Sequence, residues 1–85
     1  MEIELLRFKN IKDLKNKLSK MVEKYNWKIG EIAPKIYYDN DFQDYELMFS
    51  IYDKCNNLLY DVTVYYCITR TNEKIIVETS YEKQY

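Results

Sequence analysis

The first strong pattern of apolar and polar positions along the chain has the period of an α-helix. Between residues 10 and 25, apolar side chains recur three or four positions apart, so they share one stripe of a helix about 100° wide. These positions are Ile11, Leu14, Leu18, Met21, Val22 and Tyr25. Asn10 is a suitable N-cap, and Asn26 and Gly30 lie where the helix should end. The pattern predicts an amphipathic helix over residues 10–25.

After Pro34 the period changes to two, which is typical of strands with one apolar face. The three segments that alternate in this way are residues 45–52, 60–69 and 75–81. Pairing Asp53 with Leu58 and Thr69 with Lys74 across two turns places apolar side chains opposite each other in both hairpins. The resulting pairs are Ile51–Tyr60, Phe49–Val62, Leu47–Val64 and Tyr45–Tyr66, then Ile68–Ile75, Tyr66–Val77 and Val62–Tyr81. Such agreement predicts a meander.

Two further strands complete the expected sheet. Residues 35–39 fit beside the first strand of the meander, with Ile36 opposite Leu47 and Tyr38 opposite Tyr45. Residues 2–8 are expected to form an edge strand, because Ile3, Leu5 and Phe8 are apolar. The order β-α-β-β-β-β predicts one α+β domain over residues 1–85. It is a two-layer sandwich, with the helix packed on one face of a four- to five-stranded antiparallel meander.

The charges of the chain are unevenly distributed although the net charge is only −1. Residues 7–28 carry eight cationic side chains against two acidic ones, a net charge of +6, whereas residues 29–85 carry five against ten, a net charge of −5. The helix is therefore basic and the sheet acidic. Cys55 and Cys67 are too few for a disulfide scaffold, and no long apolar run or basic leader occurs, so a cytoplasmic protein with reduced thiols is expected.

The sequence lacks the residues on which the common catalytic sites depend. There is no histidine, which removes the usual general base and metal ligand, and one glycine is too few for a phosphate-binding loop. Asp39, Asp41 and Asp44 are oxygen ligands in type, but a turn rich in Asp and Asn explains them better than a cation site. Asp61, Glu78 and Glu82 become neighbours in the predicted register, which indicates a fraying edge strand rather than a catalytic pair. We expect no enzyme, no cofactor and no metal.

Two surfaces remain as candidates for binding. On the sheet face away from the helix, the predicted apolar and aromatic residues are Tyr37, Met48, Tyr52, Leu59, Tyr65, Cys67 and Ile76. Acidic residues surround them, which is the composition of a protein interface rather than of a nucleic-acid interface. The alternative is the lysine face of the helix, where Lys12, Lys17, Lys20 and Lys24 are candidates for contacts to phosphates.

In its overall build, rather than in any motif, the chain resembles the small proteins that phages and archaeal viruses direct against host defences, anti-CRISPR proteins among them. The shared features are short length, few cysteines and abundant Lys, Asn, Ile and Tyr; they cover no aligned stretch and assign no residue.

The expected function is a protein-binding inhibitor or adaptor that masks a basic surface, such as a nucleic-acid-binding groove. A nucleic-acid-binding regulator and a homodimeric structural protein are the alternatives. The predicted partner-binding residues are Asp39, Asp41, Phe42, Asp44, Glu46, Tyr52, Tyr65 and Glu78.

Overall fold

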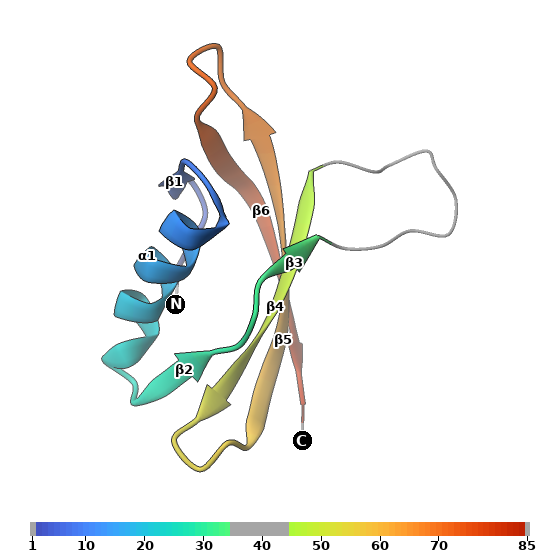
Figure 1. Ribbon diagram of the computed structural model, residues 1–85. Helices are drawn as coiled ribbons and strands as arrows, with labels where there is room; N and C mark the ends of the chain where they lie inside the picture. Colours follow the sequence, from blue (N-terminus) through green and yellow to red (C-terminus); the bar gives the residue numbers. More distant parts are fainter. Residues whose placement is uncertain (1, 35–44, 85) are drawn as a thin grey trace.

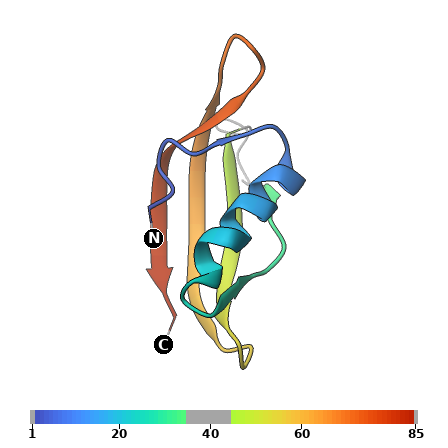
Figure 2. The ribbon, with the colours of Figure 1, turned by 90° about the vertical axis from the view of Figure 1, so that its left-hand side faces the viewer.

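The computed structural model describes residues 2–34 and 45–84, in which one helix lies against one face of an antiparallel sheet (Figures 1 and 2). The elements are β1 (Arg7–Phe8), α1 (Ile11–Glu23), β2 (Trp27–Ile29), β3 (Ala33–Pro34), β4 (Glu46–Asp53), β5 (Leu58–Ile68) and β6 (Lys74–Lys83). The strand order across the sheet is β1-β6-β5-β4-β2, and β3 also pairs with β4. The predicted α+β class and the β4-β5-β6 meander are confirmed.

The N-terminus of α1 is capped as the sequence predicts. Asn10 Oδ1 accepts a hydrogen bond of 2.8 Å from the backbone N–H of Asp13, and Asp13 Oδ2 accepts one of 2.9 Å from the N–H of Lys9. At the other end, Asn26 adopts a positive φ of 60°, and its N–H donates to the carbonyl of Glu23 at 2.9 Å. Asparagine tolerates this left-handed conformation, so it ends the helix slightly before the predicted residue 25.

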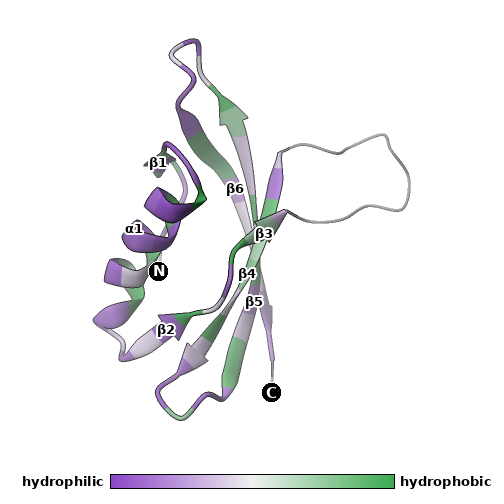
Figure 3. Cartoon of the chain, viewed as in Figure 1, coloured by the Kyte–Doolittle hydropathy of each residue, from purple (hydrophilic) through white to green (hydrophobic). Residues whose placement is uncertain are grey.

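The predicted apolar stripe is buried against the sheet in its middle and partly exposed at its ends. Leu14, Leu18 and Val22 are buried, whereas Ile11 and Tyr25 are 41 % and 43 % exposed. The outer side of the helix is hydrophilic, and along the strands hydrophobic and hydrophilic residues alternate (Figure 3). The sheet residues buried beneath the helix are Leu47, Phe49, Ile51, Val62, Val64 and Ile76.

Both hairpins of the meander have loops of three residues instead of the predicted four. In the first, the N–H of Asp53 donates to the carbonyl of Asn57 at 3.0 Å, and Asn56 has a φ of 65°. In the second, the N–H of Thr69 donates to the carbonyl of Glu73 at 2.8 Å, and Asn72 has a φ of 64°. A type I turn followed by a left-handed residue is a common hairpin loop, and asparagine supplies that residue in both.

The shorter turns change the pairing near each loop by one residue, and an irregularity in each ladder restores the predicted register beyond it. Leu58 therefore pairs with Tyr52, not Asp53, and Lys74 pairs with Ile68, not Thr69. The confirmed pairs are Ile51–Tyr60, Phe49–Val62, Leu47–Val64, Val62–Tyr81, Asp61–Glu82 and Tyr65–Glu78. The N–H of Tyr66 also donates to the carbonyl of Tyr45 at 2.9 Å, as the predicted pairing requires.

The irregularity in β6 reverses which residues of its first half face the helix, compared with the predicted register. Tyr66 pairs with Ile76 and not with Val77, and Ile75 pairs with Cys67 and not with Ile68. Ile76 is consequently fully buried, whereas Val77 is 51 % exposed. The prediction that Ile76 belongs to the face away from the helix was therefore wrong, because the extra residue of a bulge reverses the alternation that precedes it.

The N-terminal segment differs from the predicted edge strand over residues 2–8. Arg7–Phe8 is the part of this segment that forms a strand with β6, and Leu5 and Leu6 add backbone hydrogen bonds to Ile76. Ile3 and Phe8 are buried as expected, but Leu5 lies in a turn and is 75 % exposed. The N–H of Leu6 donates to the carbonyl of Ile3 at 3.2 Å and closes this turn.

The strand β2, which follows shortly after α1, is not predicted by the sequence pattern. Trp27 and Ile29 pair with Asp53 and Ile51 of β4. The predicted strand over residues 35–39 lies outside the described residues, but one of its predicted contacts is corrected: Pro34, not Ile36, pairs with Leu47. Three residues are short for a strand, and the pairing with β4 is what selects this conformation.

Candidate partner-binding face of the sheet

The sheet has one face that no described helix or strand covers, which we call the open face (Figure 1). Its members alternate with the buried residues of the same three strands. They are Glu46, Met48, Ser50 and Tyr52 of β4, Asp61, Thr63, Tyr65 and Cys67 of β5, and Ile75, Glu78, Ser80 and Glu82 of β6. Four are carboxylates, and Lys28 of β2, opposite Tyr52, adds one cation at the edge.

Tyr65 lies at the centre of the first cluster on the open face. Glu46 is its partner on one neighbouring strand and Glu78 on the other. Burial is the main cause that raises the pKa of Tyr65 above 10.0, and a hydrogen bond to the Glu46 carboxylate and the charge of Glu78 raise it further. The hydroxyl therefore keeps its proton and donates. Glu46 Oε2 is buried and has no hydrogen-bond partner among the residues described.

A second pair of carboxylates lies further along the same face. Asp61 and Glu82 are direct partners across β5 and β6. Ser50 Oγ donates a hydrogen bond of 2.6 Å to Asp61 Oδ1. Asp61 and Glu82, together with Met48 and Ser80, border a depression of about 340 Å³. Like charges that face each other across strands are destabilising unless a cation lies between them.

The charges of the open face are not neutralised within the described part of the chain. Its three ion pairs join Arg7 to Glu73, Lys15 to Glu31 and Lys17 to Asp13, and none of them involves the four carboxylates of the open face. No group of three or more His, Cys, Asp or Glu among the described residues has the arrangement of a metal site. The open face therefore presents four carboxylates beside Tyr65 and Met48, none of them in an ion pair with a described residue.

Tyr52 lies towards the other end of the open face, away from Tyr65. Its ring lies over the single glycine of the chain, where a Cβ on Gly30 would approach Tyr52 Cε2 to 3.0 Å. The N–H of Gly30 donates to the carbonyl of Ser50 at 2.9 Å. Gly30 thus allows the aromatic ring to lie close to the backbone, which its position between a helix and a predicted strand did not reveal.

The structure brings together only part of the predicted partner-binding set. Glu46, Tyr65 and Glu78 are neighbours on three adjacent strands, and Tyr52 shares their face. The predicted contacts Asp39, Asp41, Phe42 and Asp44 lie outside the described residues. The possible metal ligands in that segment lie outside them as well.

Two lysines of the helix form ion pairs within the chain. Lys17 Nζ donates to the carbonyl of Arg7 at 2.7 Å and lies 3.2 Å from Asp13 Oδ2, and Lys15 Nζ lies 3.3 Å from Glu31 Oε1. Lys12, Lys20 and Lys24 are exposed. These three remain as the lysines of the alternative nucleic-acid surface.

Comparisons with protein-family models, with curated proteins and with solved structures find no match to the chain. The class of protein is defined by the fold of the described residues, an α+β arrangement of one helix on an antiparallel sheet with an open acidic face. The described residues include no helix of the length and apolar character required to span a membrane. Cys55 and Cys67 are free and exposed.

Proposed function

We propose that this chain is a small non-enzymatic inhibitor or adaptor that binds a basic surface of a partner protein through its open face. The observation that supports this most is the pairing of Asp61 with Glu82 across adjacent strands, where no cation of the described residues forms an ion pair with either. A lysine or arginine of a partner placed between them relieves their repulsion. Tyr65 and Met48 beside them supply the apolar contact area that interface cores require.

The cellular setting belongs to the same proposal. Two free cysteines fit a reducing compartment such as the cytoplasm. The resemblance in build to anti-CRISPR proteins favours a nucleic-acid-binding groove of a host-defence protein as the basic surface. In that case the four carboxylates of the open face take the place of phosphates.

The test compares two double charge reversals in capture experiments from a lysate of the source organism, with and without nuclease. Glu78→Lys with Glu82→Lys reverses two exposed charges on the open face, and Lys12→Glu with Lys20→Glu reverses two on the helix. We expect one stoichiometric protein to be retained by the unmodified chain and by the helix variant after nuclease treatment. The open-face variant should lose it.

Three exposed lysines on one helix favour a second candidate, a regulator that binds nucleic acid. Each phosphate contact contributes to a steep salt dependence, so Lys12, Lys20 and Lys24 would give binding that disappears with added salt. Capture that is abolished by nuclease and by the helix variant, but not by the open-face variant, would replace the main proposal with this one.

A homodimer through the open face is the third candidate, and the open-face variant would then elute as a monomer in size-exclusion chromatography.

A further inference from the structure

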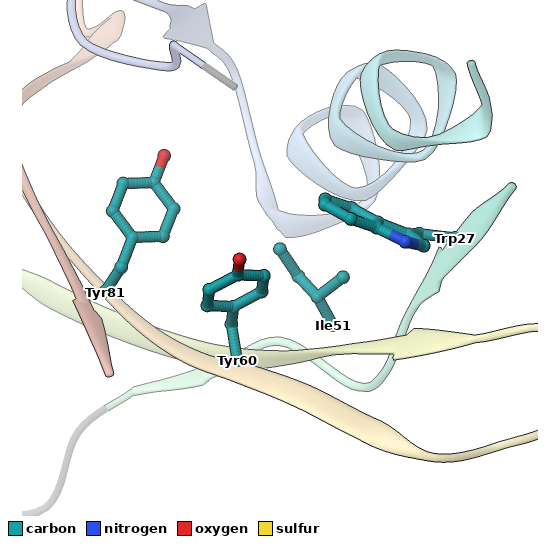
Figure 4. Close-up of a pocket in the computed structure, with 4 residues that line it drawn as sticks. All are labelled: Trp27, Ile51, Tyr60 and Tyr81. Atoms are coloured by element: carbon teal, nitrogen blue, oxygen red, sulfur yellow. The ribbon is translucent and has the colours of Figure 1, made fainter. Parts of the chain in front are cut away.

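A pocket of about 180 Å³ lies on the helix side of the sheet, opposite the open face (Figure 4). Four strands contribute one residue each: Trp27 from β2, Ile51 from β4, Tyr60 from β5 and Tyr81 from β6. Ile51 is 1 % exposed and forms the floor, whereas Tyr81 is 42 % exposed and leaves the pocket accessible. A cavity of roughly 150 Å³ accommodates a group of the size of benzene, so this pocket has room for a small ligand group.

Three aromatic rings line the pocket, and each is in contact with the next at an inclined angle. The ring centroids of Trp27 and Tyr60 are 5.8 Å apart with an interplanar angle of 55°, and those of Tyr60 and Tyr81 are 6.4 Å apart at 79°. Rings inclined to one another in this way present more than one π-face or edge to the same space. A cation within about 6 Å of a ring centroid is attracted by the negative π-face, and tryptophan is the best ring for this purpose.

The same aromatic row already contacts one ammonium group. Tyr25 stacks on Trp27 with a centroid distance of 4.8 Å, and Lys24 Nζ lies 5.2 Å from the Tyr25 centroid. This contact lies at the end of the row, on the exposed Tyr25. The pocket side of the row consists of Trp27, Tyr60 and Tyr81.

Negative charge lies beside the pocket. Glu2 and Glu4 line an adjoining hollow that shares Tyr81 with it. Burial is the main cause that raises the pKa of Tyr81, and the charges of Glu4 and Glu2 add to it, so the hydroxyl stays neutral. The opposing cation is Lys83, the partner of Tyr60 across the β5–β6 ladder.

We propose that this pocket binds an organic cation, the ammonium or guanidinium group of a lysine or arginine side chain presented by another protein. Trp27, Tyr60 and Tyr81 hold the cation by cation–π contacts, Ile51 closes the floor, and Glu2 and Glu4 attract the charge. The site lies on the opposite side of the sheet from the open face. The proposal therefore does not depend on the proposed function, and its test needs no partner protein.

The test follows the fluorescence of Trp27, the only tryptophan of the chain, during titration with small probes at constant ionic strength. The first pair of probes is choline and its uncharged isostere 3,3-dimethyl-1-butanol. The second set is the N-acetyl amides of lysine and arginine, with the N-acetyl amide of norleucine as the neutral control. We expect saturable binding of the cations with dissociation constants of the order of 10 mM, as two or three cation–π contacts allow, and at least about fivefold weaker binding of the neutral analogues.

Tyr81→Leu and Tyr81→Phe form a matched pair of variants. Tyr81 is partly exposed, so both should fold; the first removes the ring, whereas the second keeps it. We expect about fivefold or greater weakening with leucine and less than about twofold with phenylalanine. The double variant Glu2→Gln with Glu4→Gln should weaken the binding of the cationic probes at low salt and leave the binding of the neutral probes unchanged.

The two sources of the cation are separated by the probes. Binding of the lysine or arginine amides supports a side chain as the ligand, and binding of choline alone overturns that assignment. Equal affinity for charged and neutral probes would identify an ordinary apolar pocket and overturn the proposal. Absence of any saturable change in Trp27 fluorescence would overturn it as well, and titration of Tyr60→Leu checks that a positive signal arises in this pocket.

Discussion

Among the described residues, four other than glycine adopt positive φ angles, and three of them are asparagines at the end of a helix or in a hairpin loop. The fourth is Leu5, with a φ of 69°. The hydrogen bond from Leu6 to Ile3 places Leu5 third of the four residues of a β-turn, the position at which a type II turn requires a positive φ. A left-handed conformation costs an L-residue with a side chain roughly 1 to 2 kcal/mol, and glycine avoids most of this cost.

We therefore expect Leu5→Gly to raise the free energy of unfolding by about 1 kcal/mol, which corresponds to a rise of roughly 4 to 8 °C in Tm for a domain of this size. Leu5 is mostly exposed, so little packing is lost. Thermal unfolding monitored by circular dichroism measures the change. Leu5→Val is the matched control and should lower Tm, because a β-branched residue is strained further at this φ. A lower Tm for the glycine variant would show that the leucine side chain stabilises the fold.

The carboxylate of Asp53 accepts hydrogen bonds from the loop of the first hairpin. Its Oδ1 accepts 2.9 Å hydrogen bonds from the N–H groups of Asn57 and Cys55, and Oδ2 accepts one of 3.0 Å from Asn57 Nδ2. The hydrogen bond from the Asn57 backbone is the main cause that lowers the pKa of Asp53 below its usual 3.8. A carboxyl whose pKa is lower in the folded state stabilises the fold above its unfolded pKa, and this contribution is lost as the pH falls through the folded pKa.

The expected result is that Asp53→Asn lowers the urea midpoint near neutral pH and that its difference from the unmodified protein shrinks below about pH 4. Asparagine retains an oxygen acceptor for the turn, so the pH-dependent part reports the charge. Asp13→Asn serves as a comparison, because a hydrogen bond from the Lys9 backbone lowers the pKa of Asp13 in the same way. A difference between Asp53→Asn and the parent that is constant with pH would show that the charge has no role.

At the scale of the elements, the bulge in β6 decides which residues belong to the core. An uninterrupted register would bury Val77 and expose Ile76, and the structure does the opposite. Ile76 pairs with Tyr66, its N–H donates to the carbonyl of Leu6 at 3.0 Å, and its carbonyl accepts from Leu5 at 2.7 Å. The bulge thus joins the N-terminal segment to the sheet and completes the core beneath β1.

Replacing Ile76 and Val77 separately by threonine tests this register directly. Both variants keep a β-branched side chain, so strand propensity changes little. We expect Ile76→Thr to lower the free energy of unfolding by about 2 kcal/mol or more, since it leaves a cavity and buries a hydroxyl. Val77→Thr should change it by less than about 0.5 kcal/mol. Urea denaturation of the two proteins measures both, and the reverse ranking would show that the predicted pairing of Val77 with Tyr66 is correct.

At the scale of the whole molecule, the structure places opposite charges on opposite sides of a thin domain. The basic helix covers one face of the sheet, the acidic open face is the other, and the shortest extent of the molecule is 18 Å. The Debye length is about 10 Å at 0.1 M salt, so a charged surface in contact with one side is largely screened from the other.

The protein should therefore bind to both cation- and anion-exchange resins at neutral pH and about 0.1 M salt, although its net charge is −1. Lys12→Glu with Lys20→Glu is expected to abolish retention on the cation exchanger and to strengthen it on the anion exchanger. Salt gradients on the two columns provide the measurement. Passage of the unmodified protein through the cation exchanger without delay would contradict the charge separation.

Much of the candidate surface was predictable from the sequence. The positions of Glu46, Tyr65 and Glu78 on one face follow from the alternation in the middle of each strand, where the predicted pairs are confirmed. Ile76 was misplaced because the length of a hairpin loop, three residues or four, is not determined by its composition. The aromatic pocket was not predicted, since Trp27 lies in a strand that forms only against β4.

The sequence by itself therefore determined the helix with its Asn10 cap, the central register of the meander and the separation of basic and acidic faces. These features depend on periodicity and on hydrogen bonds between residues close in the chain, and such interactions can be read locally. The tertiary structure alone decided the bulge that buries Ile76, the turn at Leu5 and the pocket formed by four strands. Each of these depends on which segments lie side by side, and the free energy gained by burying apolar surface between distant residues outweighs local preference there.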